Sequence, residues 1–350
     1  MKSQPTSLPR FLANSQTLLE NSLHDYAEHR FAIGVKRGTI EREERTIKQF
    51  AKITHCGPEG WEPYLLEIVM NAQQRAGLKD ATRLRNQSAL QSYARYLADP
   101  MFPWKERYLR LLGAAITDPF VNGNARRHFY QPYARDVQPM LPEQYRKLFA
   151  YADALTDSPS PARSISAHRN AVMLKLALAS GARRNELMTI NRGDILRNAS
   201  IPTYGDHGGL LIRNGKSKAF GPPRERTIYV TPVHDFIVKV LEQYTEMIRP
   251  EFPNVSERLF VKTTGEPITS NSASSMFAHY CREVGIPKGF GFHSLRRSFA
   301  TELALEDYDG WFISEMLGHE CPATTAQYLF FSSDFIMQYL RQLQARLLES

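Results

Sequence analysis

The sequence predicts a mainly helical fold with a small antiparallel β-sheet in the second of two domains. The chain has 350 residues, which exceeds the usual size of a single domain. Apolar residues recur at helical spacing along most of it. Residues 209–231 differ, because they hold two short stretches of aliphatic and β-branched residues around a turn rich in glycine and proline.

The first domain is expected to be all-helical. Ile40, Ile47, Phe50 and Ile53 recur at helical spacing between charged residues, so a helix is expected from about Thr39, the predicted N-cap. Further helices are expected over residues 62–76, 82–97 and 104–116, the last of which follows a proline.

A linker is expected at about residues 118–140, where helical spacing is lost and prolines accumulate. We therefore predict a helical domain over residues 1–136 and a second domain over residues 137–350. An apolar stripe at helical spacing predicts a tail helix over residues 332–350, which could also pack on its own core.

The second domain is expected to open with two helices, over residues 142–155 and 162–180. A β-hairpin follows, with strands at residues 209–213 and 226–231. Helices then resume at Pro232 and continue, with breaks, to the end of the chain. The small sheet is therefore an insertion in a helical domain.

Composition narrows the class of partner and the compartment. The net charge of +8 and pI of about 9.3 favour a polyanionic partner, although ordinary enzymes share this balance. Cys56, Cys281 and Cys321 are an odd, widely spaced set, and the polar start of the chain carries no secretory signal, so a cytoplasmic location is expected. No apolar run reaches the roughly 20 residues of a bilayer span, so no membrane crossing is expected.

Five polar residues, far apart in the chain, carry the chemistry. Arg183 follows a probable helix end, His293 and Arg296 share one helix face, His319 follows a glycine, and Tyr328 lies nine residues further on. Each alone has an ordinary structural explanation, such as a surface ion pair or core packing. Together they supply a phenol, two fixed cations and two imidazoles, a set suited to opening a phosphodiester without a metal.

Four motifs in order resemble those of the tyrosine recombinases of the phage integrase family. The segment SGARRNEL at residues 180–187 is similar to the family's first arginine motif. HSLRRSFAT at residues 293–301 is similar to its HxLR box, and LGHECPATTAQY at residues 317–328 to its closing motif. NGK at residues 214–216 lies between the two predicted strands, where the family has its catalytic lysine.

The resemblance implies a two-domain clamp, made of a helical core-binding domain and a catalytic domain, that acts as a site-specific DNA recombinase or integrase. The catalytic residues that it implies are Arg183, Lys216, His293, Arg296, His319 and Tyr328. Tyr328 would attack the scissile phosphate and form a 3′-phosphotyrosine, with His293 as proton acceptor. Lys216, or alternatively Lys218, would protonate the departing 5′-oxygen. Strand exchange would pass through a Holliday junction.

Double-stranded DNA is the partner that follows from this resemblance, in a bacterial, phage or mobile-element setting at the nucleoid. Candidate DNA contacts in the first domain are Lys79, Arg83, Arg85, Arg95, Lys105, Arg107 and Arg110. Candidate readers of base edges, which also suit any exposed helix face, are Gln87, Ser88, Gln91 and Ser92. The tail helix would dock on a neighbouring protomer and build a homotetramer, with accessory directionality factors as possible further partners.

Some features depart from the family pattern or point elsewhere. Arg184 and Arg297 replace other common residues, and AFGPP at residues 219–223 lengthens the hairpin turn. Two near-matches, a phosphate loop at residues 209–217 and paired HxC segments, do not fit a nucleotide or zinc site, so no cofactor and no metal are expected. The alternatives are a type IB topoisomerase and a DNA-binding relative without catalysis.

Overall fold

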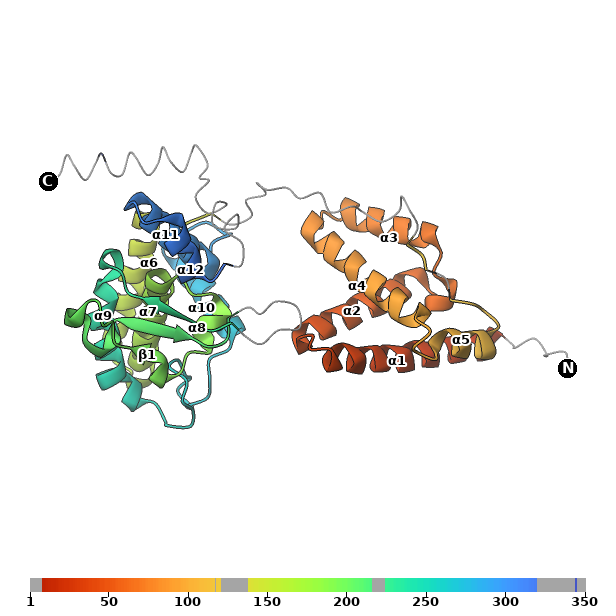
Figure 1. The fold of residues 1–350 in the computed structure, drawn as a ribbon, viewed down its shortest axis with the longest axis horizontal. Helices are drawn as coiled ribbons and strands as arrows, with labels where there is room; N and C mark the ends of the chain where they lie inside the picture. The colour runs from red at the N-terminus through yellow and green to blue at the C-terminus, as the bar shows by residue number, and fades with distance from the viewer. Residues whose placement is uncertain (1–7, 117, 121–137, 216–223, 320–343, 345–350) are drawn as a thin grey trace. The chain divides into compact units, whose positions relative to one another are not determined.

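The computed structural model describes residues 8–116, 118–120, 138–215, 224–319 and 344. The chain divides into two compact units, Met1–Tyr130 and Gln131–Ser350, and each has its own hydrophobic core (Figure 1). The described residues are mostly helical, with one three-stranded antiparallel sheet, as the sequence predicts. The predicted boundary near residue 137 lies at the edge of an undescribed stretch and stays a prediction.

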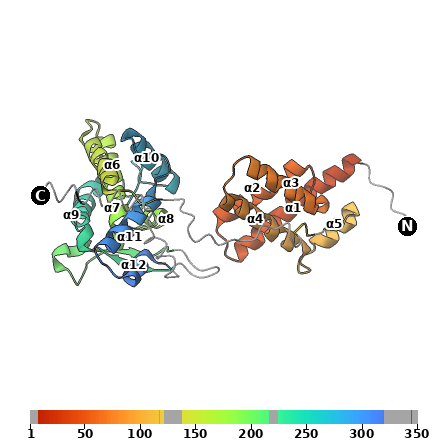
Figure 2. The ribbon, with the colours of Figure 1, turned by 90° about the horizontal axis from the view of Figure 1, so that it is seen from above.

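The described residues of the first unit form five α-helices (Figure 2). They are α1 (Leu8–Ala32), α2 (Arg37–Thr54), α3 (Pro63–Arg75), α4 (Asp80–Ala98) and α5 (Trp104–Leu112). Helices α2 to α5 lie close to their predicted ranges. The predicted N-cap at Thr39 is wrong, because α2 begins two residues earlier and its N-cap is the extended Lys36. Helix α5 ends earlier than predicted because Gly113 adopts a left-handed conformation (φ 70°).

Helix α1 was not foreseen from the sequence, because its buried face includes a serine. Ser22 is fully buried, and its hydroxyl lies 2.6 Å from the hydroxyl of Tyr93 and 3.3 Å from that of Tyr108. Leu23 and Tyr26 lie on the same side and are buried too. Paired hydroxyls satisfy each other inside an otherwise apolar core, so tertiary contacts stabilise this helix more than its amphipathic pattern does.

The second unit is built around α7 (Pro161–Ser180). From Ala171 to Ser180 every side chain except that of Lys175 is buried, because α7 packs against helices on several sides. The helices of the described part of this unit are α6 (Pro142–Ala154), α7, α8 (Arg184–Met188), α9 (Phe236–Gln243), α10 (Ser270–Glu283), α11 (Phe292–Leu305) and α12 (Gly310–Leu317). Helices α6, α9 and α11 all contact α7.

The sheet of the second unit has the strand order β1-β2-β3 and is antiparallel throughout. Its strands are β1 (Ile195–Leu196), β2 (Gly209–Ile212) and β3 (Arg226–Tyr229). The β2–β3 hairpin confirms the predicted pairing, with Leu210 opposite Ile228. Strand β1 was missed because two residues are too short to show alternation. Helix α12 packs against β3, which brings the hairpin next to the candidate site residue His319, just after α12.

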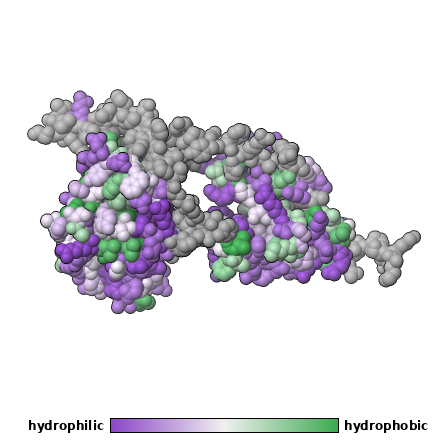
Figure 3. Space-filling view, viewed as in Figure 1, coloured by the Kyte–Doolittle hydropathy of each residue, from purple (hydrophilic) through white to green (hydrophobic). Residues whose placement is uncertain are grey.

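The described surface is mostly polar on the side seen in the space-filling view, with small scattered apolar patches (Figure 3). Within the described ranges, we find no helix with the length and apolar character that a membrane span requires.

Candidate active site

The site begins where α7 ends. Gly181 adopts a left-handed conformation (φ 57°), which most residues with a side chain avoid. A Cβ atom at this position would lie 2.5 Å from Cδ1 of Phe299 on α11. Only glycine therefore fits both the turn and the close approach of α11. The turn leads directly into Arg183, the N-cap residue of α8.

Arg183 is held by two acceptors. Its Nη1 donates to Oε1 of Glu186 at 2.8 Å, and its Nη2 donates to the carbonyl oxygen of Gly318 at 3.2 Å. The backbone amide of Arg183 also donates to Oε2 of Glu186, at 2.9 Å. The arginine side chain is 28% exposed, so its guanidinium is fixed and still reaches solvent. This position suits a cation that meets a ligand from outside.

Arg296 lies deeper, on α11, and is fully buried. Its Nη1 donates to the carbonyl oxygen of Gly181 at 2.7 Å, and its Nη2 donates to that of Leu317 at 2.7 Å. The same Nη2 lies 3.0 Å from Nε2 of His319. Arg296 thus joins the end of α7 to the end of α12, through contacts between residues far apart in the sequence.

His319 is a neutral imidazole in this setting. It is 7% exposed, and burial, followed by the charges of Arg296 and Arg183, lowers its pKa to about 3. Because an arginine can only donate, Nε2 of His319 accepts from Arg296 and the ring proton lies on Nδ1. The N–H donor of His319 is therefore at Nδ1.

His293 lies one turn before Arg296 on α11, as its spacing predicts, and its side chain is exposed. Desolvation, followed by the positive charges of Arg296, Arg297 and Arg183, lowers its pKa to about 4. At neutral pH the imidazole carries no charge and can accept a proton.

Three arginines meet three consecutive carbonyl groups at the end of α12. Nε of Arg226 donates to the carbonyl oxygen of Met316 at 3.0 Å, next to the bonds that Leu317 and Gly318 accept from Arg296 and Arg183. The last carbonyls of a helix lack partners within it and carry its negative partial charge. The arginines supply those partners, so the end of α12 and the cationic site form one hydrogen-bonded unit.

Sequence reasoning missed Arg226 as a member of this site. It lies on β3, is buried, and forms a two-pronged ion pair with Glu186, at 3.2 Å and 2.8 Å. A signal was present, because Arg226 shares its face of the strand with the buried Ile228 and Val230 at a period of two. Burial alone would raise the pKa of Glu186, but hydrogen bonds and charge from Arg226, with help from Arg183, lower it to about 2.

Lys216, its alternative Lys218, and Tyr328 lie outside the described residues. The structure does describe the neck of the hairpin that contains both lysines. The amide of Gly215 donates to the carbonyl oxygen of Arg224 at 3.1 Å, and a Cβ on Gly215 would overlap that oxygen. The chain therefore enters the lysine segment from a closed, narrow neck.

The candidate DNA contacts of the first unit divide into two kinds. Six of them have exposed side chains, and these are Lys79, Arg85, Arg95, Lys105, Arg107 and Arg110. Arg83 is buried instead, and it donates to Asp80 and to Oε1 of Gln74, at 2.7 Å in the latter case. Of the candidate base readers, Gln87 is buried, whereas Ser88 is exposed. The placement of Arg83 and Gln87 fits a structural role within the unit.

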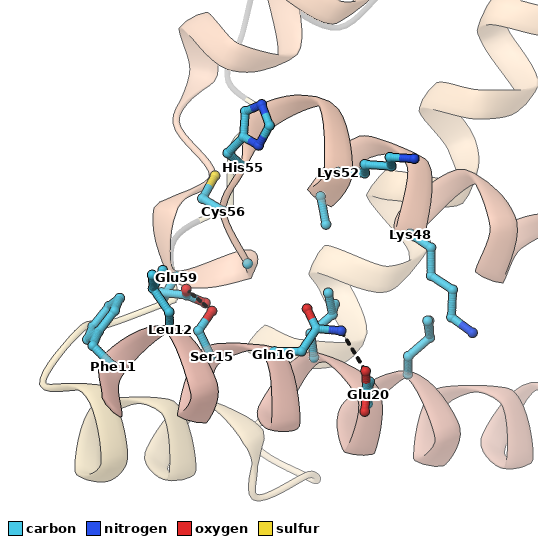
Figure 4. Close-up of a pocket in the computed structure, with 14 residues that line it drawn as sticks. Phe11, Leu12, Ser15, Gln16, Glu20, Lys48, Lys52, His55, Cys56 and Glu59 are labelled. Atoms are coloured by element: carbon cyan, nitrogen blue, oxygen red, sulfur yellow. Dashed lines mark hydrogen bonds between the residues drawn. The ribbon is translucent and has the colours of Figure 1, made fainter. Parts of the chain in front are cut away.

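A hollow of about 850 Å³ lies between α1 and α2 in the first unit (Figure 4). Some of its polar groups pair with each other, as Ser15 donates to Glu59 and Gln16 donates to Glu20. Cys56 lines the same hollow, and burial raises the pKa of its thiol. Among the described residues, no group of three or more histidine, cysteine, aspartate or glutamate side chains is placed to hold a metal ion.

The second unit matches a known protein family. Residues 138–332 match the phage integrase family, and this segment makes up more than half of the chain. The chain therefore belongs to the phage integrase family. The matched segment contains all of the second unit's described site residues, from Arg183 to His319.

Two relatives from staphylococci resemble part of this chain. Tyrosine recombinase XerD of Staphylococcus saprophyticus is 30% identical over 195 residues, which are 55% of this chain and 60% of the relative. Tyrosine recombinase XerD of Staphylococcus aureus is 30% identical over 196 residues, with the same coverage. The chain thus matches about three fifths of the length of these relatives.

Solved structures share the fold. A lambda integrase dimer bound to a COC′ core site has a TM-score of 0.61 at 18% identity, over 89% of this chain and 94% of that one. A lambda integrase tetramer bound to a Holliday junction also has a TM-score of 0.61, at 17% identity, over 94% and 81% of the two chains. The XerH recombinase bound to its difH substrate before cleavage has a TM-score of 0.55 at 19% identity, over 84% and 75%.

Proposed function

We propose that this chain is a site-specific DNA recombinase that cuts and rejoins DNA through a covalent bond to Tyr328. One observation carries the proposal. In a member of the phage integrase family, Arg183, Arg296 and His319 converge at the ends of α7 and α12 and on α11, with hydrogen-bonding groups fixed by the fold. Two permanent cations and an N–H donor in one place suit a phosphodiester anion.

The arginines would stabilise the charge that develops during cleavage. As the phenolic oxygen of Tyr328 bonds to phosphorus, negative charge builds on the non-bridging oxygens, where Arg183, Arg296 and Nδ1–H of His319 can donate. The bond from phosphorus to the 5′-oxygen breaks, which leaves a 3′-phosphotyrosine. A DNA 5′-hydroxyl reverses these steps, so the energy of the phosphodiester is retained and no ATP is required. Fixed guanidinium charges fill the role that a metal ion has in other nucleases.

Two proton transfers complete the step. His293 takes the phenolic proton of Tyr328, and Lys216, or Lys218, gives a proton to the departing 5′-oxygen. The low pKa of His293 makes it a weak base in the free protein. A bound phosphate offsets the neighbouring arginine charges, so its pKa rises in the DNA complex and the imidazole becomes a better proton acceptor.

The proposal assigns the rest of the chain to DNA binding and assembly. Residues 1–136 form the core-binding domain and residues 137–350 the catalytic domain, and the six exposed lysines and arginines named above contact DNA phosphates. The tail helix over residues 332–350 docks on a neighbouring protomer in a tetramer that holds a Holliday junction. The protein works in the cytoplasm at its DNA target, with directionality factors as further partners.

A nicked suicide substrate tests the proposal. When the short fragment beyond the cut diffuses away, the wild type is expected to remain covalently attached to DNA. Tyr328→Phe removes the nucleophile and is expected to bind the same DNA without becoming attached. Covalent attachment of Tyr328→Phe would refute the role of Tyr328. Supercoil relaxation without recombinant product would favour a type IB topoisomerase, and binding without attachment by the wild type would favour a relative without catalysis.

A further inference from the structure

Arg226 touches both groups that hold Arg183. Glu186, the first acceptor of Arg183, forms a two-pronged ion pair with Arg226, and Oε1 of Glu186 accepts from both arginines. Gly318, the second acceptor, packs against Arg226 so closely that a Cβ at this position would lie 2.9 Å from the Arg226 side chain. Arg226 therefore contacts both groups that hold Arg183, the carboxylate of Glu186 and the end of α12.

We propose that Arg226 is a positioning residue, which orients Arg183 for the reaction by holding Glu186 and the end of α12. The side chain of Arg226 is 4% exposed, so it is far less accessible to DNA than Arg183. Its three donors match three acceptors with fixed geometry, namely the two oxygens of Glu186 and the carbonyl oxygen of Met316. A planar guanidinium can serve all three together, whereas an ammonium group is a single point of charge.

The charges explain why this support is needed. Glu186 is one carboxylate between two guanidinium groups, and Arg226 engages both of its oxygens. Without Arg226, both oxygens of Glu186 would turn to Arg183, and the resulting two-pronged pair would draw that guanidinium away from the DNA. Arg183 is the most exposed member of the trio, so its place depends on these hydrogen bonds more than on packing. The end of α12 would also lose one of its carbonyl partners.

The inference rests on the proposed function and is tested with Arg226→Lys in the full chain. The single-turnover rate of covalent attachment at saturating nicked DNA is expected to fall about a hundredfold, the loss typical of a misplaced reacting group. The dissociation constant for the same DNA is expected to change by less than about threefold, because Arg226 is not at the DNA surface. A general loss of folding would change both quantities.

Arg249→Lys is the matched control. Arg249 is also buried and donates to the carbonyl groups of Ser256 and Arg258, and none of these hydrogen bonds reaches Glu186 or α12. This variant is expected to lower the melting temperature about as much as Arg226→Lys and to keep the wild-type rate of attachment. An equal loss of rate in both variants would show that Arg226 is only structural, and would overturn the inference.

A double variant and a spectroscopic measurement separate the inference from the proposed function. If Arg226 acts through Arg183, adding Arg226→Lys to Arg183→Lys is expected to slow attachment by less than about threefold. Full additivity would overturn the inference. The Nε–Hε NMR signal of Arg183, assigned by its loss in Arg183→Lys, is expected to shift in Arg226→Lys and not in Arg249→Lys. An unchanged NMR signal of Arg183 would overturn the inference, whether or not the wild type attaches to DNA. Failure of the wild type to attach to DNA would contradict only the proposed function.

Discussion

Lowering the pH from 7 to 5 is expected to destabilise the second unit through His319. Its pKa is about 3 in the folded protein, because of burial and the charges of Arg296 and Arg183, and about 6.5 in an unfolded chain. Between these values the unfolded chain binds a proton that the folded chain does not. The stability that the neutral imidazole contributes is therefore fully present above pH 6.5 and is lost as the pH falls toward 3.

The expected magnitude follows from the two pKa values. Stability changes by at most about 1.4 kcal/mol per pH unit for one group, and the change from pH 7 to pH 5 sums to about 2 kcal/mol for His319. His293, whose pKa is also lowered, acts in the same direction. The carboxylate of Glu186 adds little to the change in stability between pH 7 and pH 5. Its pKa is about 2 in the folded protein and 4.5 ordinarily, so the stability that it contributes is lost only as the pH falls below 4.5.

Hydrogen exchange of buried amides in α7 and α11 measures the opening free energy of this unit. It is read by mass spectrometry at pH 7, 6 and 5 and corrected for intrinsic exchange rates. His319→Gln keeps a side-chain acceptor for Arg296 but cannot titrate, so it is expected to lose about 2 kcal/mol less than the wild type over this range. His279→Gln, at an exposed position on α10, is the control and is expected to follow the wild type. Identical pH dependence in wild type and His319→Gln would refute the argument.

Three further outcomes are expected. Gly181→Ala, which forces a Cβ against Phe299 at a left-handed position, should destabilise the chain by more than about 1 kcal/mol in urea unfolding, whereas Gly193→Ala, which meets nothing within 4 Å, should not. Arg85→Ala should reduce the slope of log DNA affinity against log salt concentration by about one. Arg83→Ala should leave this slope unchanged and lower the melting temperature. The reverse result would contradict the exposed position of Arg85 and the buried position of Arg83. Covalent attachment should proceed undiminished in excess EDTA, and a rate that recovers only on adding Mg²⁺ would refute the charge argument.

The elements and residues that could be predicted from the sequence share a local signal. Helices α2 to α7 show helical spacing, and the hairpin shows a turn between β-branched stretches, so local pattern and final structure agree. Arg183, and the pair His293 and Arg296, could be recognised because each lies in a short motif whose members are close together in the sequence. That these residues meet His319 at one place depends on how α7, α11 and α12 pack, which no local pattern encodes.

The features that the sequence did not reveal depend on contacts between distant parts of the chain. Arg226 and Arg83 look like exposed charges in sequence, yet both are buried because a carboxylate of the same unit pairs with them. Helix α1 was missed because the buried Ser22 breaks its apolar stripe. Besides a local bond to the carbonyl oxygen of Leu19, its hydroxyl pairs with tyrosines about 70 or more residues away. Pairing of buried polar groups is decided by tertiary contacts, and a single sequence gives little sign of it.

The hydrogen bonds at the end of α12 also determine when the cluster of arginines can become ordered during synthesis of the chain. The contacts of Arg296 with Gly181 and of Arg183 with Gly318 span 115 and 135 positions of the sequence. A growing chain on the ribosome therefore has no ordered anion site until α12 has emerged and docked, although its first unit can already fold. Under the proposed function, the capacity to bind DNA is thus expected to precede the capacity to cut it.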